Sequence, residues 1–270
     1  MIEKNPIRSG KEKRTVYPYE LFWGLDFYTI LIAAGFLAAL ILFRVLSDRA
    51  KISAGVQNLC IVAGLASLIG GYLAAVFTQA IYNAIASGRF SLANDTGATF
   101  YGGLLGGIGT FLAVYAIGGR LRLPEGEAKR QLPRVFNIGI CGVILAHAFG
   151  RIGCLFAGCC YGQKTHAWYG IWNADLGVKT VPIQLFEAMF LFALCGFLSW
   201  RQLRGKMQNT AFYFILYGVW RFVIEFFRAD DRGKTIVPFL SPSQLVAILL
   251  VIVGACLLVR AKIQRKRETV

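Results

Sequence analysis

Seven long apolar stretches dominate this sequence and restrict the folds available to it. They lie at about 27–46, 59–83, 100–118, 135–157, 184–200, 211–227 and 243–259. Each is close to the roughly 20 apolar residues that a helix needs to cross a bilayer. The chain is also 56% apolar and only 16% charged, with a mean hydropathy of +0.57. We therefore predict an all-α polytopic membrane protein with seven transmembrane helices.

The ends of the apolar region divide the chain into three parts. The first stretch is too long and begins too late for a cleaved signal peptide, and it lacks a cleavage site, so we expect the mature protein to retain it. We find no soluble domain, heptad pattern or internal repeat. The prediction is a polar N-terminal segment at 1–26, a seven-span transmembrane domain at 27–259 and a basic tail at 260–270.

Basic residues are distributed unequally between the two sets of connections. One set holds 15 Lys or Arg residues and the other holds 6. The first comprises about 47–58, 119–134, 201–210 and the C-terminal tail, and the second comprises 84–99, 158–183 and 228–242. By the positive-inside rule the first set is cytoplasmic, which places the N-terminus outside and the C-terminus in the cytoplasm. The N-terminal segment does not fit this orientation, because it carries five basic residues although it is placed outside.

The net charge of +15 suggests two classes of anionic partner. Nucleic-acid binding would need a basic stripe with interleaved aromatic residues outside the membrane loops, and we find none. Basic tails beside a membrane attract anionic lipid instead, at about 1 kcal/mol per residue. We expect membrane lipid as a partner and no nucleic acid.

The segment HAFGRIGCLFAGCCYG, residues 147–162, covers the end of the fourth apolar stretch and the residues that follow it. It contains one arginine and three cysteines. At about 100° per residue, four of its residues share one helical stripe: His147, Arg151, Cys154 and Gly158. An ionised group at membrane depth costs at least ~2.5 kcal/mol, so Arg151 requires a partner, and we expect an anion.

A second polar stripe lies on the sixth stretch, where Tyr217, Arg221, Glu225 and Arg228 fall on one helix face. Arg221 and Glu225 can pair at i,i+4, and this pairing could serve helix packing alone. The predicted topology brings further polar groups to the same external side: Tyr101, Gly102, Gly103, Gln184, Glu187, Ser243 and Gln244.

Positive charge exceeds negative charge among these groups, because three arginines face only Glu187 and Glu225. Guanidinium groups favour phosphate oxygens, and a site walled by apolar helices admits a lipid sideways. We therefore expect a phospholipid head group. The run YGGLLGGIG at 101–109 permits close approach of a ligand or a neighbouring helix, but helix packing is the more common role of such a run.

These residues carry a family resemblance. The matching segments are FWGLDFY at 22–28, FYGGLLGG at 100–107, FGRIG at 149–153, PIQLFEA at 182–188, RFVIEFFRADD at 221–231 and SPSQL at 241–245. In order and spacing the chain resembles the prolipoprotein diacylglyceryl transferases of the bacterial plasma membrane. The resemblance implies transfer of diacylglycerol from phosphatidylglycerol to the lipobox cysteine of a prolipoprotein signal peptide, at a site toward the outer leaflet.

The resemblance also implies residue roles. Arg151 and Arg221 would bind the phosphate, with Glu225 and Arg228 as their partners and Gln184 and Glu187 in the head-group pocket. Tyr101 and Glu225 are the candidates for proton transfer, whereas we expect His147 to contact a helix and His166 to be solvated. The remaining candidate substrate-binding residues are Gly102, Gly103, Gln244, Trp23, Cys154 and Cys159.

Four positions depart from the family pattern. Cys154 occupies an asparagine position, Cys159 a glutamate position, Tyr101 a histidine position and Trp23 a tyrosine position. Arg151 and Arg221, in contrast, match the family pattern. Lipid-phosphate binding is therefore better supported by the resemblance than the chemistry at the acceptor thiol, and a related head-group transferase with another acceptor stays an alternative.

The seven cysteines support an alternative of another class. Cys60, Cys141, Cys195 and Cys256 lie inside apolar stretches and are predicted to pack as small core residues. The other three, Cys154, Cys159 and Cys160, form what we call the cysteine cluster, at the predicted external face. They could act as a thiol–disulfide relay of a membrane oxidoreductase. Zinc binding is disfavoured by their spacing, so we expect no metal and no cofactor.

Overall fold

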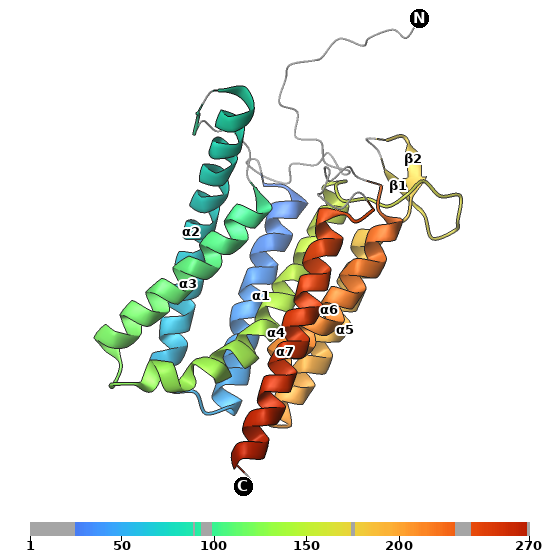
Figure 1. The fold of residues 1–270 in the computed structure, drawn as a ribbon. Coiled ribbons are helices and arrows are strands. Elements are labelled where there is room, and N and C mark those ends of the chain that lie inside the picture. The colour runs from blue at the N-terminus through green and yellow to red at the C-terminus, as the bar shows by residue number, and fades with distance from the viewer. Residues whose placement is uncertain (1–24, 89, 93–98, 174–175, 230–238, 269–270) are drawn as a thin grey trace, which may run out of the picture. The chain divides into compact units, whose positions relative to one another are not determined.

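The computed structural model describes residues 25–88, 90–92, 99–173, 176–229 and 239–268, and its main elements are helices (Figure 1). They are α1 Phe27–Arg49, α2 Ala54–Ser87, α3 Phe100–Arg122, α4 Glu127–Phe156, α5 Ile183–Leu203, α6 Asn209–Ile224 and α7 Pro242–Glu268. Seven helical segments in this part of the chain are long and apolar enough to cross a membrane. The prediction of an all-α polytopic membrane protein is confirmed.

The helices extend beyond the apolar stretches because polar residues define their ends. The Ser53 side chain accepts a hydrogen bond from the Val56 amide and caps α2. At the other end of α2, Gly88 adopts the left-handed conformation with φ 71°, and its amide donates to the Ala84 carbonyl. The helix therefore begins and ends several residues outside the predicted stretch at 59–83.

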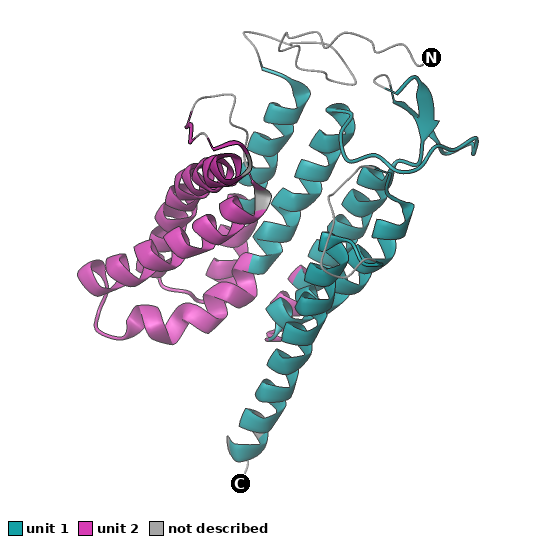
Figure 2. Cartoon of the chain, turned by 45° about the horizontal axis from the view of Figure 1, so that its top comes forward, with its two compact units in different colours: residues 1–39, 140–198, 208–270 teal, residues 40–139, 199–207 magenta. Residues whose placement is uncertain are grey.

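Contacts divide the chain into two compact units (Figure 2). One unit comprises residues 40–139 and 199–207, and α2 packs against α3 within it. A Cβ added at Gly102 would lie 2.5 Å from Thr78 Oγ1, and one at Gly106 would lie 2.1 Å from the Cβ of Ala74. These contacts support helix packing as the role of the glycine run.

The other unit comprises residues 1–39, 140–198 and 208–270, of which the structure describes the parts given above. In it α6 and α7 lie close together, since a Cβ added at Gly218 would lie 2.8 Å from the Ala247 carbonyl oxygen. A short antiparallel hairpin connects α4 to α5. Its strands are β1 Ile171–Asn173 and β2 Val178–Thr180, with Trp172 opposite Lys179.

The intramembrane cysteines only partly match the prediction. Cys60, Cys141 and Cys195 are buried, as expected of small core residues. Cys256 is exposed on α7, so its assignment to the core is wrong. It lies on an apolar helix beside exposed Leu257. A helix in a bilayer can direct such a face toward lipid, and apolarity therefore does not identify the core of a membrane protein.

Candidate active site

A buried carboxylate on α5 joins residues of three helices. Glu187 is 1% exposed. Its Oε2 lies 2.9 Å from Arg151 Nε on α4, and its Oε1 accepts a hydrogen bond of 2.9 Å from the Tyr217 hydroxyl on α6. The His147 ring packs edge-on against Tyr217 with 5.3 Å between ring centroids. The helix-contact role predicted for His147 agrees with this geometry, and His166 is exposed, as expected.

A second ion-pair network lies at the end of α6. Arg221 Nη2 is 2.8 Å from Glu225 Oε2 and also donates to the Ser243 hydroxyl at 2.9 Å. Arg228 Nε lies 3.8 Å from the same Glu225 oxygen. The predicted i,i+4 pairing is confirmed. Glu225 belongs to a short 3-10 helix, η1 Glu225–Phe227, rather than to a continued α-helix.

The start of α7 is built as a capping box around Ser241 and Gln244. The Gln244 amide donates to Ser241 Oγ at 3.2 Å, and the Ser241 amide donates to Gln244 Oε1 at 2.9 Å. Pro242 occupies the first helical position, where its missing N–H costs nothing. Ser241 Oγ in turn donates to Glu225 Oε1 at 2.8 Å. The cap of α7 therefore also fixes the Glu225 carboxylate.

We call Arg151, Glu187, Arg221, Glu225 and Arg228 the arginine–glutamate centre. It contains three cations and two anions, all with largely buried side chains. Arg221 Nη1 is buried without a hydrogen-bond partner among the described residues. Arg151 Nε is also without a hydrogen bond there, although it is ion-paired with Glu187. Buried donors of this kind can hydrogen-bond an anionic ligand.

The turn after α4 differs from the predicted stripe. α4 ends at Phe156, and Gly158 lies beyond it with φ 67°. The Gly158 amide donates to the Leu155 carbonyl and the Cys159 amide to the Cys154 carbonyl, which is the Schellman pattern. Placing Gly158 on the helical stripe was wrong. Its role as a helix-ending glycine could have been recognised from the sequence.

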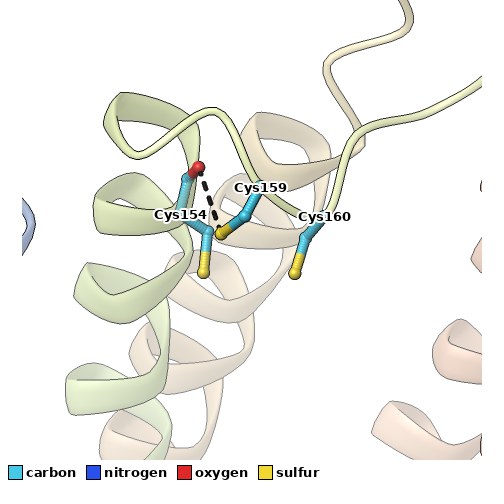
Figure 3. Close-up of side chains that lie close together, drawn as sticks. All are labelled: Cys154, Cys159 and Cys160. Atoms are coloured by element: carbon cyan, nitrogen blue, oxygen red, sulfur yellow. Dashed lines mark hydrogen bonds between the residues drawn. The ribbon is translucent and has the colours of Figure 1, made fainter. Parts of the chain in front are cut away.

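This turn brings the cysteine cluster together (Figure 3). The three sulfur atoms all lie within 4.8 Å of one another, and none is in a disulfide. The pKa of the Cys160 thiol is lowered by the thiols of Cys154 and Cys159 and then by the Arg228 guanidinium, although burial opposes this shift. The pKa of Cys159 is raised by the other two thiols and by burial. Cys160 is therefore the more acidic of these two thiols.

Backbone pairing connects the cysteine cluster to the end of η1. The Gln163 amide donates to the Phe227 carbonyl at 3.0 Å, and Gly162 forms an antiparallel bridge with Arg228. On the other side, the Gln184 side-chain amide donates to the Cys159 carbonyl at 2.7 Å. Gln184 Oε1 is buried without a hydrogen-bond partner in the described part of the chain. Gln184 thus both supports the turn and offers a free acceptor.

Some predicted site residues lie in a different compact unit from this centre or outside the described residues. Tyr101, Gly102 and Gly103 belong to the other compact unit, and Trp23 lies outside the described residues. The prediction also omitted Ser241, which contacts Glu225 directly. Its signal was present in the sequence, because S-x-x-Q before an apolar run is a capping box.

Seven membrane-length helices among the described residues and a buried centre with more arginines than glutamates define a multi-pass membrane protein with a net positive internal polar site. Comparison with known families gives a more specific assignment. A sequence model described as prolipoprotein diacylglyceryl transferase matches residues 19–260. The chain belongs to the prolipoprotein diacylglyceryl transferase family.

The sequence is also similar to individual relatives along most of its length. It is 32% identical over 262 residues to phosphatidylglycerol–prolipoprotein diacylglyceryl transferase 2 of Clostridium perfringens, covering 93% of this chain and 96% of that protein. It is also 32% identical over 246 residues to the enzyme of the same name from Clostridium tetani, covering 87% and 93%. A further relative from Finegoldia magna is 25% identical over 254 residues.

Proposed function

We propose that this chain transfers diacylglycerol from phosphatidylglycerol to the lipobox cysteine of prolipoproteins, in lipoprotein biosynthesis. Family membership and the names of the relatives support this assignment. The observation that carries it is the buried Arg221 Nη1 without a hydrogen-bond partner among the described residues, within a centre of net positive charge. Such a group is placed to bind a lipid phosphate.

The proposed reaction balances without a metal or a cofactor. The acceptor thiolate attacks the glyceryl carbon next to the phosphate oxygen. A carbon–sulfur bond forms, the carbon–oxygen bond breaks, and glycerol phosphate leaves with the bonding electron pair. The thiol proton passes to a base, and negative charge moves from sulfur to the leaving phosphate. Arginines preorganised at that phosphate stabilise the transition state more than the ground state.

The contacts suggest different roles for the charged residues. Arg221 is held by Glu225 and Ser243 and would present its remaining nitrogen to the phosphate. Arg151 is oriented by Glu187 and would add positive charge at the same group. Glu225 interacts with two guanidinium groups and Ser241, which favours a positioning role over proton transfer. Tyr101 stays the other candidate for proton transfer.

We also propose that the protein lies in the bacterial plasma membrane with its site toward the outer leaflet. The excess of basic residues at 119–134 and in the C-terminal tail supports a cytoplasmic location for those segments. The loops at 158–183 and 228–242 would then be external. This orientation places the arginine–glutamate centre near the leaflet from which an exported prolipoprotein presents its cysteine.

One assay tests the proposed activity directly. The purified full chain is mixed with phosphatidylglycerol labelled in its acyl chains and a lipobox peptide, with and without reductant. We expect the label to appear on the peptide, with glycerol phosphate as the second product, and reductant to maintain or raise the rate. Absence of labelled peptide under reducing conditions would reject the proposal.

A membrane thiol–disulfide oxidoreductase is the second candidate, favoured by the proximity of the three sulfur atoms of the cysteine cluster. In that case a disulfide would form and be reduced during turnover, and loss of single thiols would abolish function. Counting free thiols before and after the transfer assay separates the two activities. A transferase leaves the number of thiols in the enzyme unchanged.

A further inference from the structure

The linear spacing of the cysteine cluster leads us to expect no metal, but the structure brings its three sulfur atoms close together, in a geometry that the proposed transfer reaction does not use. We propose that Cys154, Cys159 and Cys160 form a binding site for one soft, thiol-binding metal cation, for which Cu(I) is the best match. The proposal is independent of the transfer reaction, and binding is measured without lipid or peptide.

The distances between the sulfur atoms fit one ion. All three atoms lie within 4.8 Å of one another (Figure 3). Metal–sulfur bonds of about 2.3 Å, at angles of about 110–120°, place ligand sulfurs about 3.8–4.0 Å apart. The sulfur atoms therefore need to shift by about 1 Å or less to surround a single cation.

The backbone holds this arrangement before any ion binds. The Schellman turn at Gly158 folds Cys159 back over Cys154, and the Cys159 carbonyl is held by the Gln184 side chain. The Asn173 side-chain amide donates to the Gly158 carbonyl at 3.2 Å. Cys160 adopts φ 61°, a left-handed conformation that is unfavourable for any residue with a Cβ. Strained backbone positions of this kind cluster at functional sites.

The chemistry of the ligand set favours a soft cation. Thiolates select Cu(I) and Zn²⁺ over hard ions such as Mg²⁺. Among the described His, Cys, Asp and Glu residues, the group of possible ligands contains these three thiols and no fourth member. Zn²⁺ normally takes four ligands and would need a water as well, whereas Cu(I) is satisfied by three sulfurs.

Charge around the cluster is also favourable. Three thiolates with Cu(I) carry a charge of about −2 if every thiol loses its proton to solvent on binding. Arg151 interacts electrostatically with Cys154, and Arg228 interacts with Cys160. Both guanidinium groups therefore offset the negative charge of the loaded site. No electron is transferred in this step, so no oxidant is required.

The test uses the full chain in detergent, reduced and kept without oxygen. Cu(I) is delivered from a competing chelator, Zn²⁺ is tested in a parallel titration, and Mg²⁺ serves as the hard-ion control. We expect one Cu(I) per chain, weaker binding of Zn²⁺ and no retention of Mg²⁺. X-ray absorption should show a single shell of three sulfur atoms around copper.

Single substitutions identify the ligands. Cys154→Ser, Cys159→Ser and Cys160→Ser should each weaken Cu(I) binding at least tenfold, while Cys256→Ser, outside the cluster, should not change it. Elution from size-exclusion chromatography shows whether each variant is folded. Full Cu(I) binding by a folded variant in which all three cysteines are replaced by serine would overturn the proposal. Binding of Zn²⁺ by the unchanged chain without binding of Cu(I) would also overturn it. So would a disulfide within the cluster that persists under reducing conditions.

Discussion

Arg221 shows how one side chain can be both structural and available to a ligand. Its Nη2 is shared by Glu225 and Ser243, while Nη1 is buried without a hydrogen-bond partner in the described part of the chain. A lysine has one compact ammonium group and cannot replace a planar group with separate donors. The two nitrogens of Arg221 thus allow positioning and binding at the same time.

We expect Arg221→Lys to reduce kcat/KM for diacylglyceryl transfer by roughly 10- to 100-fold, because a charge-assisted hydrogen bond contributes about 1.5–3 kcal/mol. The labelled-lipid assay measures this loss. Arg44→Lys is the matched control, since Arg44 is an exposed arginine that pairs with Asp48. Transfer by Arg221→Lys at the wild-type rate would remove Arg221 from the phosphate site.

Glu187 illustrates the cost of a buried charge that loses its partner. Replacing it with Gln would leave Arg151 buried without its ion-pair partner. We expect Glu187→Gln to lower stability by about 3–5 kcal/mol, measured by thermal or denaturant unfolding in detergent. Glu125→Gln, at an exposed position, should have little effect. Equal stability of the two variants would contradict a structural role for the Glu187–Arg151 pair.

At the scale of elements, helix ends rather than helix middles build the site. The capping box of α7 fixes Glu225 through Ser241, and the Schellman turn after α4 assembles the cysteine cluster. Helix ends carry unsatisfied backbone groups that polar side chains must satisfy. The same side chains can then orient charged groups of neighbouring elements.

The cap of α7 gives a prediction with a matched control. Ser241→Ala should lower stability by about 1 kcal/mol through loss of the cap, and it should also reduce transfer because Glu225 loses a hydrogen bond. Ser53→Ala removes a cap of the same type from α2. We expect it to lower stability by about the same amount and to leave transfer unchanged. If both variants lose activity equally, the Ser241–Glu225 contact has no specific role.

At the scale of the whole molecule, the distribution of charge predicts how the chain crosses the membrane. In a Cys256→Ser background, Cys159 and Cys160 should react with an impermeant maleimide added to intact, reduced cells. A cysteine introduced by Gly126→Cys should react only after lysis, because the 119–134 connection is predicted to be cytoplasmic. Mass spectrometry of the labelled peptides gives the result. The opposite pattern would reverse the proposed orientation.

The sequence alone determined the class of protein and its local pairings. Seven apolar stretches require membrane helices because the backbone must satisfy its own hydrogen bonds in lipid. The Arg221–Glu225 pair follows from helix periodicity. These features depend only on residues that are close together in the sequence. The similarity of short motifs such as RFVIEFFRADD to those of a known family also indicated the family.

Only the tertiary structure decided which distant groups meet. It paired Arg151 with Glu187, placed Ser243 against Arg221 and brought Cys160 beside Cys154. It also showed that Cys256 is exposed. The physical reason is that helix rotation and packing select these contacts. Hydropathy gives the length of a membrane helix, but lipid and protein interiors are similarly apolar, so it does not give the face that the helix buries.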